Sequence, residues 1–342
     1  MKKRPIIVHI GFPKTGTTSL QAGLGRSRDQ LLANGFCYPV SLGDTNQYHL
    51  EAYAFNFDKG LGTHTIVGVH NSEDLKRFRK DCAQQLIDEV KALPDSVEKV
   101  IVSNEGLAGL TSEGDFDRFF ELLNKVGHVE KVVAYIRRQD KNAASNYTTY
   151  LKTGGTRKNI LQKYSPGSAA YIFYGDKLKI WADRIGIDKI AVRYFDKVEM
   201  KDGDIFSDFR DVTGLPKAVN FEVKERTNPS ITPAACEFLR AFNERFPRFV
   251  DGKNNPARAT VRETLEAKYA GPGRMPTQRD VADYMQQFAA SNEYIRANWF
   301  PERPHLFDDN YSEYPEKDFL ASTAEVTEIF NEVWAQRFEA SS

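Results

Sequence analysis

The feature that most constrains this chain is an apolar run that leads directly into a loop containing glycine, lysine and threonine. Residues 5–10 are almost continuously apolar, as in a strand buried on both faces of a parallel sheet. The run is too short for the core of a signal peptide, although it follows three basic residues. The loop at residues 11–19 comes next, and a helical pattern begins at Thr17. We therefore expect residues 5–10 to form the first strand of a parallel sheet.

Short β-branched runs alternate with helical patterns through the first half of the chain. Such alternation predicts an α/β fold with a parallel sheet flanked by helices. The expected strands are residues 36–40, 99–103, 131–136 and 189–195, and the expected helices are residues 17–34, 72–93 and 115–126. Gly35 is expected to end the first helix, and Ser72 to cap the second.

Helical patterns dominate after about Gly214. Thr232 and Pro233 are typical of a helix start, and this helix is expected to continue through Asn243. Further helices are expected at residues 279–298 and 315–338. Residues 251–278 are rich in Gly, Pro, Asn and Arg and have weak periodicity, so we interpret them as a loop and candidate lid. We expect one domain over residues 1–342, in which residues 1–215 are the α/β core and residues 216–342 a mainly helical extension.

The net charge of the chain is zero, so the protein as a whole would not attract a highly charged partner. The 47 basic and 47 acidic residues cancel, so we expect neither a nucleic-acid partner nor attraction to an anionic membrane surface. No run approaches the ~20 apolar residues that a membrane span needs. The three cysteines at positions 37, 82 and 236 are scattered, which fits neither a disulfide framework nor a zinc knuckle. We therefore expect a cytoplasmic protein.

The loop after the first strand is a candidate anion-binding site. Backbone N–H groups and the positive end of a helix dipole meet at a turn from strand to helix. Gly16 allows close approach of a ligand to the backbone, and hydroxyls follow it on three successive residues. The pattern is not a Walker A loop, because Lys14 precedes Gly16 instead of following it. The alternative is that Lys14 is an ordinary solvated loop lysine.

The Pro-Lys-Thr-Gly-Thr-Thr core at residues 13–18 resembles the 5′-phosphosulfate loop of the sulfotransferase family. Members of this family use 3′-phosphoadenosine 5′-phosphosulfate as the sulfuryl donor. The resemblance is clearest over residues 5–40 and 98–152. It implies a P-loop-NTPase-like sheet, contact of Lys14 with the 5′-phosphate and the bridging oxygen, and a phosphate cradle of Thr15, Gly16, Thr17, Thr18 and Ser19.

The family's second landmark is a strand that ends in arginine, followed eight residues later by serine, and both side chains reach the 3′-phosphate. Arg137 and Ser145 have this spacing. Arg138 and Gln139 stand where the family usually has Asp-Pro, which leaves open which arginine takes the phosphate; we favour Arg137. An arginine makes a bidentate contact with phosphate. The loop around Arg274 is a weaker candidate for a third phosphate contact.

Glu105 is the candidate base that would deprotonate the acceptor. It follows the expected strand 99–103, and should therefore lie at the same sheet edge as Lys14. Glycan-modifying members of the family resemble this chain in having a catalytic glutamate in that region. The alternatives are a capping or surface glutamate, or a histidine base, as in the members that act on small molecules. The histidines in question are His49, His64 and His70.

These patterns together predict a sulfotransferase that acts on a hydroxyl or amine acceptor. The resemblance favours a carbohydrate or glycoconjugate acceptor over another small molecule. No His, Cys and Asp cluster has the spacing of metal ligands, so we expect a metal-independent enzyme. The rival readings are a P-loop nucleoside or sugar kinase, and a non-catalytic protein that binds nucleotides or glycans.

Overall fold

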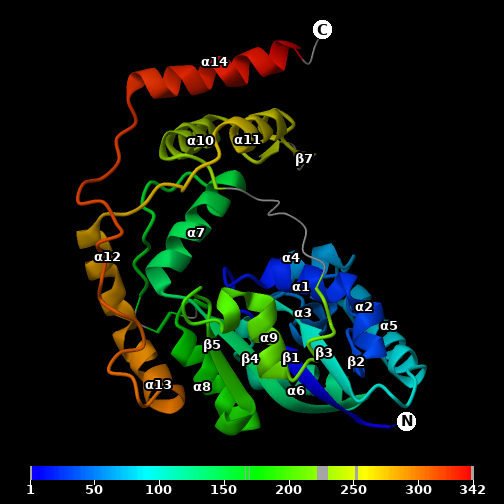
Figure 1. Cartoon of the computed structure of the whole chain (residues 1–342). Helices are drawn as coiled ribbons and strands as arrows, with labels where there is room; N and C mark the ends of the chain where they lie inside the picture. The colour runs from blue at the N-terminus through cyan, green and yellow to red at the C-terminus, as the bar shows by residue number, and fades with distance from the viewer. Residues whose placement is uncertain (1, 166, 169, 222–229, 251–252, 340–342) are drawn as a thin grey trace. The chain divides into compact units, whose positions relative to one another are not determined.

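The computed structural model describes residues 2–165, 167–168, 170–221, 230–250 and 253–339 (Figure 1). It contains two compact units. The first unit comprises Met1–Arg137, Ala169–Val223 and Ala290–Leu306. The second comprises Arg138–Ser168, Lys224–Ala289 and Phe307–Ser342.

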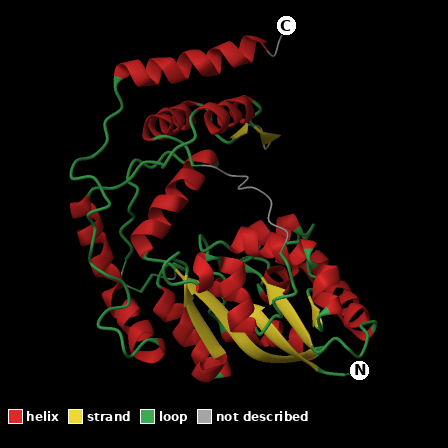
Figure 2. Cartoon of the chain, viewed as in Figure 1, coloured by secondary structure: helices red, strands yellow, loops and turns green. Residues whose placement is uncertain are grey.

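A five-stranded parallel sheet forms the centre of the first unit (Figure 2). The strand order is β2-β3-β1-β4-β5, with β1 in the middle. This sheet and the helices around it confirm the predicted α/β fold class. Because β1 is central, the loop that follows it lies between the loops after β3 and β4 at the carboxyl edge. The strands are β1 (Arg4–His9), β2 (Phe36–Cys37), β3 (Lys99–Ser103), β4 (Gly127–Ile136) and β5 (Ile190–Tyr194).

Alternate side chains of the sheet build the buried core. Ile7 and Ile101 lie side by side in register on β1 and β3, and both belong to one apolar cluster. Leu20 and Leu24 of α1 (Thr17–Arg26) join this cluster, as does Phe209 of α9 (Ile205–Thr213). The intervening strand residues point to the opposite face and are also buried. The continuous apolar run at residues 5–10 therefore reflects burial on both faces.

Two helices of the first unit differ from the predictions at their ends, and the helix expected at residues 315–338 begins only at Thr323. The expected helix at 17–34 is two helices, α1 and α2 (Arg28–Ala33), because Ser27 leaves the helical conformation between them. A break of one residue does not disturb the apolar periodicity. The cap of α5 (Ser72–Lys91) is Asn71 and not Ser72, since the Asn71 side chain accepts hydrogen bonds from the N–H groups of Glu73 and Asp74.

Further helices lie in the described part of the first unit. Rings of α6 and α8 pack together, since Phe116 and Phe119 each meet the indole of Trp181 edge-on. These helices are α3 (Tyr48–Ala54), α4 (Leu61–Ile66), η1 (Glu105–Gly109), α6 (Glu113–Asn124), α8 (Tyr174–Ile185), η2 (Ile187–Lys189) and η3 (Lys201–Gly203). Helix α13 (Ala289–Trp299) starts at the boundary between the units.

The second unit is mainly helical. Thr232 caps α10 and Pro233 occupies its first turn, as predicted. The expected loop at 251–278 is wrong over α11, where Val261, Thr264 and Leu265 form a buried helical face that charged neighbours obscure in the sequence. Its role as a lid stays a prediction. The helices are α7 (Gln139–Lys152), α10 (Pro233–Arg245), α11 (Ala257–Lys268), α12 (Gln278–Met285) and α14 (Thr323–Glu339), and the short strands are β6 (Phe249–Val250) and β7 (Lys253–Asn254).

None of the helices in the described part of the chain combines the length and the apolar character that crossing a membrane requires. The three cysteines are buried and free.

Candidate functional site

The loop after β1 adopts a conformation that places a helix N-terminus at the edge of the sheet. Hydrogen bonds from Phe12 N to Tyr135 O (2.9 Å) and from Tyr135 N to Gly11 O (2.6 Å) fix the start of the loop against β4. Lys14 and Gly16 both have positive φ angles, of 67° and 76°. A Cβ on Gly16 would lie 2.7 Å from the Phe195 ring, so glycine is required there by both conformation and packing.

The hydroxyls of the predicted cradle fall into two groups. The hydroxyl of Thr15 donates to the carbonyl of Phe12, and that of Thr17 donates to Glu105; both side chains are buried. Thr18 and Ser19, by contrast, are exposed on the first turn of α1. Gly16 occupies the N-cap of α1, and no side chain caps this helix N-terminus.

Glu105 lies directly beside this loop. His9 and Ser103 are register partners at the ends of β1 and β3, and Asn104 N donates to His9 O at 3.1 Å. A Cβ on Gly11 would lie 3.1 Å from the Cβ of Glu105. The structure therefore brings the loop that contains Lys14 and the carboxylate of Glu105 together at the carboxyl edge of the sheet.

A second carboxylate, Glu51 of α3, lies close to Glu105 and was missed by the sequence analysis. Glu51 accepts a hydrogen bond from the Thr63 hydroxyl at 2.7 Å. It lies so close to Gly106 that a Cβ there would be 2.0 Å from its Oε2. Burial raises the pKa of Glu51; the Thr63 hydrogen bond opposes this rise, and the charge of Glu105 adds to it. No sequence pattern distinguishes Glu51 from a surface glutamate of a helix.

His9 is a buried neutral group beneath the loop. Its Nδ1 forms a 2.7 Å hydrogen bond with Ser103 Oγ, and the rings of Tyr135 and Phe209 meet it edge-on. Burial lowers the pKa of His9 to about 3, since the charged imidazolium would lose its hydration.

Arg137 follows the end of β4 and turns toward the loop. Its Nη1 donates to the carbonyl of Lys14 at 3.4 Å, and the guanidinium lies 5.7 Å from the centre of the Phe195 ring. Ser145 belongs to the second unit, where it is part of α7. The predicted pairing of Arg137 with Ser145 stays a prediction.

Arg138 is occupied by acidic partners within the second unit. Its side chain is 6% exposed and binds both oxygens of the fully buried Asp140. It also contacts Asp308 at 3.1 Å and Glu313 at 2.7 Å. The guanidinium of Arg274 is similarly engaged, because it binds both carboxylate oxygens of Asp318 at 2.8 Å. Both arginines have their charges balanced inside the unit.

Two of the three rival histidines contact backbone carbonyls through their rings. The Nδ1 of His49 contacts the carbonyl of Ser41 at 2.7 Å. His64 is buried, and its Nε2 contacts the carbonyl of Ala52 at 2.9 Å. His70 is exposed just before α5. Within the described ranges, no group of three or more His, Cys, Asp and Glu side chains is arranged to hold a metal ion.

Comparisons with known proteins give distant similarities. No protein-family model matches the chain. A protein of Archaeoglobus fulgidus described as uncharacterized is 29% identical over 145 residues, which are 42% of this chain and 38% of that protein. The matched part therefore spans well under half of that relative. The crystal structure of a sulfotransferase from Alicyclobacillus acidocaldarius aligns over 86% of this chain and 96% of its own, with a TM-score of 0.39 and 12% identity.

Proposed function

We propose that this chain is a sulfotransferase that uses 3′-phosphoadenosine 5′-phosphosulfate as donor. The acceptor is a hydroxyl or amine, on a carbohydrate or glycoconjugate. The observation that carries the proposal is the hydrogen bond from Thr17 to Glu105. This hydrogen bond supports the proposal because it joins the loop that would bind the donor to the carboxylate that would act as the base, and sulfuryl transfer needs both at one place.

The loop supplies the donor site in this proposal. The N-terminal turn of α1 and the ammonium of Lys14 both favour a phosphate at the sheet edge. When the sulfur–oxygen bond of the donor breaks, negative charge develops on the 5′-phosphate oxygen. Lys14 stabilises this charge most strongly in the transition state, and this is how it accelerates transfer.

Glu105 serves as the base. The acceptor oxygen or nitrogen attacks sulfur from the side opposite the leaving oxygen, its proton passes to the Glu105 carboxylate, and 3′,5′-adenosine diphosphate leaves. Thr17 keeps one carboxylate oxygen of Glu105 in place through its hydrogen bond. The backbone contacts of His49 and His64 give these histidines a packing role instead and support Glu105 as the base.

Arg137 is the proposed ligand of the 3′-phosphate. Its guanidinium already lies at the loop, next to the carbonyl of Lys14. Arg138 is the weaker choice, since its charge is balanced by Asp140, Asp308 and Glu313. To bind Arg138, the 3′-phosphate of the donor would have to displace these carboxylates.

Donor labelled in the sulfuryl group tests the proposal, offered together with glycan, lipid and phenol acceptors. The expected result is label in one acceptor class and release of 3′,5′-adenosine diphosphate. Magnesium-dependent transfer of phosphate from ATP would instead identify a kinase. Tight glycan binding with no transfer to any acceptor would identify a non-catalytic binding protein.

A further inference from the structure

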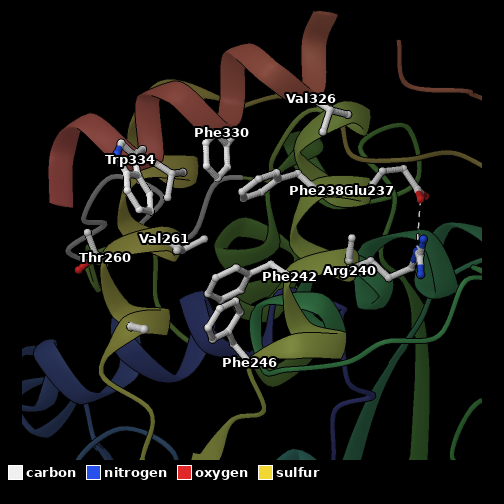
Figure 3. Close-up of a pocket in the computed structure, with 13 residues that line it drawn as sticks. Glu237, Phe238, Arg240, Phe242, Phe246, Thr260, Val261, Val326, Phe330 and Trp334 are labelled. Atoms are coloured by element: carbon white, nitrogen blue, oxygen red, sulfur yellow. Dashed lines mark hydrogen bonds and ion pairs between the residues drawn. The ribbon is translucent and has the colours of Figure 1, made fainter. Parts of the chain in front are cut away.

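The second unit contains a cavity that is lined mainly by apolar side chains. It has a volume of 510 Å³ and lies among α10, α11 and α14 (Figure 3). Helix α14 packs against both α10 and α11. The main lining residues are aromatic or aliphatic: Phe238, Phe242, Phe246, Val261, Phe330 and Trp334.

Several of these aromatic side chains are left open to solvent. Phe330 and Trp334 of α14 are 49% and 53% exposed and stack with ring centres 5.7 Å apart. Phe242 and Phe246 of α10 stack at 4.5 Å, and Phe246 is 44% exposed. Figure 3 shows these two pairs on different walls of the cavity. Exposed aromatic surface of this kind marks an interaction site, and small-molecule sites typically have volumes of roughly 300–1,000 Å³.

Positive charge gathers at the end of the cavity near Phe246. Arg258 of α11 donates a 3.0 Å hydrogen bond to the carbonyl of Phe246. A Cβ on Gly154 would lie 3.0 Å from Arg248 Cβ and 3.6 Å from Arg258 Nη2, so these two arginines flank one point of the backbone. The pKa of Arg258 is lowered, chiefly by burial and further by the positive charges of Arg248 and Arg262. In the described part of the chain, none of these three arginines has a carboxylate within ion-pair distance.

We propose that this cavity binds a single-chain anionic amphiphile. The aliphatic chain lies among the aromatic side chains of α10 and α14, and the anionic head lies beside Arg248, Arg258 and Arg262. Binding of the ligand's aliphatic chain removes exposed aromatic surface of the protein from water. The anionic head of the ligand balances the positive charge of the three arginines. The cavity is concave and of small-molecule size, whereas a partner protein would need about 800 Å² of matched surface. The site is independent of the proposed sulfuryl transfer.

Calorimetric titration of the whole chain with dodecanoate tests this proposal, with dodecanol and dodecyltrimethylammonium as probes of the head group. All three are used below their critical micelle concentrations. We expect saturable 1:1 binding in the order dodecanoate, dodecanol, dodecyltrimethylammonium. Quenching or a shift of tryptophan emission on binding is expected to disappear in Trp334→Phe, because Trp334 lines the cavity.

Two matched pairs of variants locate the ligand. Ala241 lines the cavity and Ala259 is exposed on α11 without lining it, so Ala241→Phe should weaken dodecanoate binding at least about tenfold and Ala259→Phe should not. Arg262→Glu should weaken dodecanoate binding about fivefold and leave dodecanol binding unchanged. Arg279→Glu, an exposed arginine of α12, is its charge-matched control.

Three results would overturn the proposal. The first is absence of saturable dodecanoate binding by the folded wild-type chain, and the second is equal binding by Ala241→Phe and Ala259→Phe. The third is evidence for a different occupant. If light scattering shows a dimer that Phe330→Asp dissociates, the aromatic surface binds a second copy of the protein. If the protein binds phosphatidylglycerol vesicles but not free dodecanoate, the surface binds a membrane. Circular dichroism and melting curves confirm that each variant is folded before its affinity is compared.

Discussion

The hydroxyl of Thr17 donates a hydrogen bond to the carboxylate of Glu105, although 88 positions separate these residues in the chain. Thr17 begins α1, and Glu105 begins the turn after β3. The two meet because β1 and β3 are parallel neighbours in register, so that both connections leave the sheet at the same edge. The loop that we propose binds the donor and the carboxylate that we propose as the base thus lie together at one edge of the sheet.

Glu105→Gln should reduce turnover by about 10²-fold or more while the affinity for 3′,5′-adenosine diphosphate stays within about twofold of wild type. Glutamine keeps the shape of the side chain and still accepts the Thr17 hydrogen bond, but it cannot take a proton at neutral pH. Initial rates with a saturating donor, together with calorimetry, give both quantities. An unchanged rate would return the search to His49, His64 and His70, and lost donor affinity would make Glu105 a structural residue.

Lys14→Ala should lower the rate of transfer by about 10²- to 10³-fold, the range seen when one donor to a developing oxyanion is removed. The chain should stay folded, because the Lys14 side chain is partly exposed at a loop. Lys91→Ala, at the end of α5, removes the same charge away from the site and serves as the control. Near-normal turnover in a folded Lys14→Ala variant would remove Lys14 from the mechanism.

Arg137→Ala should affect ligand binding, whereas Arg138→Ala should affect the stability of the fold. The first should weaken binding of 3′,5′-adenosine diphosphate by about 1.5–3 kcal/mol and barely affect adenosine 5′-phosphosulfate, which lacks the 3′-phosphate. The second leaves the buried Asp140 with the Tyr314 hydroxyl but without its positively charged partner, and should reduce the free energy of unfolding by about 3–5 kcal/mol. Urea denaturation and calorimetry on both variants check this assignment. Selective loss of 3′-phosphate recognition in a stable Arg138→Ala variant would reverse it.

His9 should make the protein less stable in mild acid. Burial lowers its pKa from 6.5 to about 3, so between these values the unfolded chain binds a proton that the folded chain does not. The free energy of unfolding should therefore fall as pH decreases from about 6.5 toward 3, with a limiting slope from this group of about 1.4 kcal/mol per pH unit. His9→Asn should flatten the decline between pH 6.5 and 4.5, whereas His128→Asn, on an exposed part of β4, should not. Parallel slopes for all three proteins would show that His9 is protonated in the folded state.

Features set by neighbouring residues were predictable from the sequence. The strand over Lys99–Ser103 and the helix start at Thr232 follow from local apolar runs and capping chemistry, and the parallel sheet follows from their alternation. The placement of Glu105 near the loop after β1 was also predictable, because carboxyl ends of parallel strands meet at one edge. Helix α11 was missed because its buried face has only three residues among many charged ones.

Features set by distant residues were not predictable. Arg138 gains its partner Asp308 from 170 positions away, and no local pattern distinguishes it from Arg137. The same is true of Glu51, whose environment depends on Thr63 and on the turn after β3. The cavity among α10, α11 and α14 requires the packing of three helices; the sequence analysis missed α11 and placed the start of α14 too early.

Binding of 3′,5′-adenosine diphosphate, measured beside binding of ATP with magnesium, tests the proposed function most directly because it requires no acceptor. We expect saturable binding of 3′,5′-adenosine diphosphate, with about 2.7 kcal/mol of added stability at roughly 100 times the dissociation constant. Lys14→Ala and Arg137→Ala should each reduce this binding, and ATP with magnesium should bind more weakly. Equal or tighter binding of ATP with magnesium would contradict the proposed donor site and identify the loop as that of a kinase.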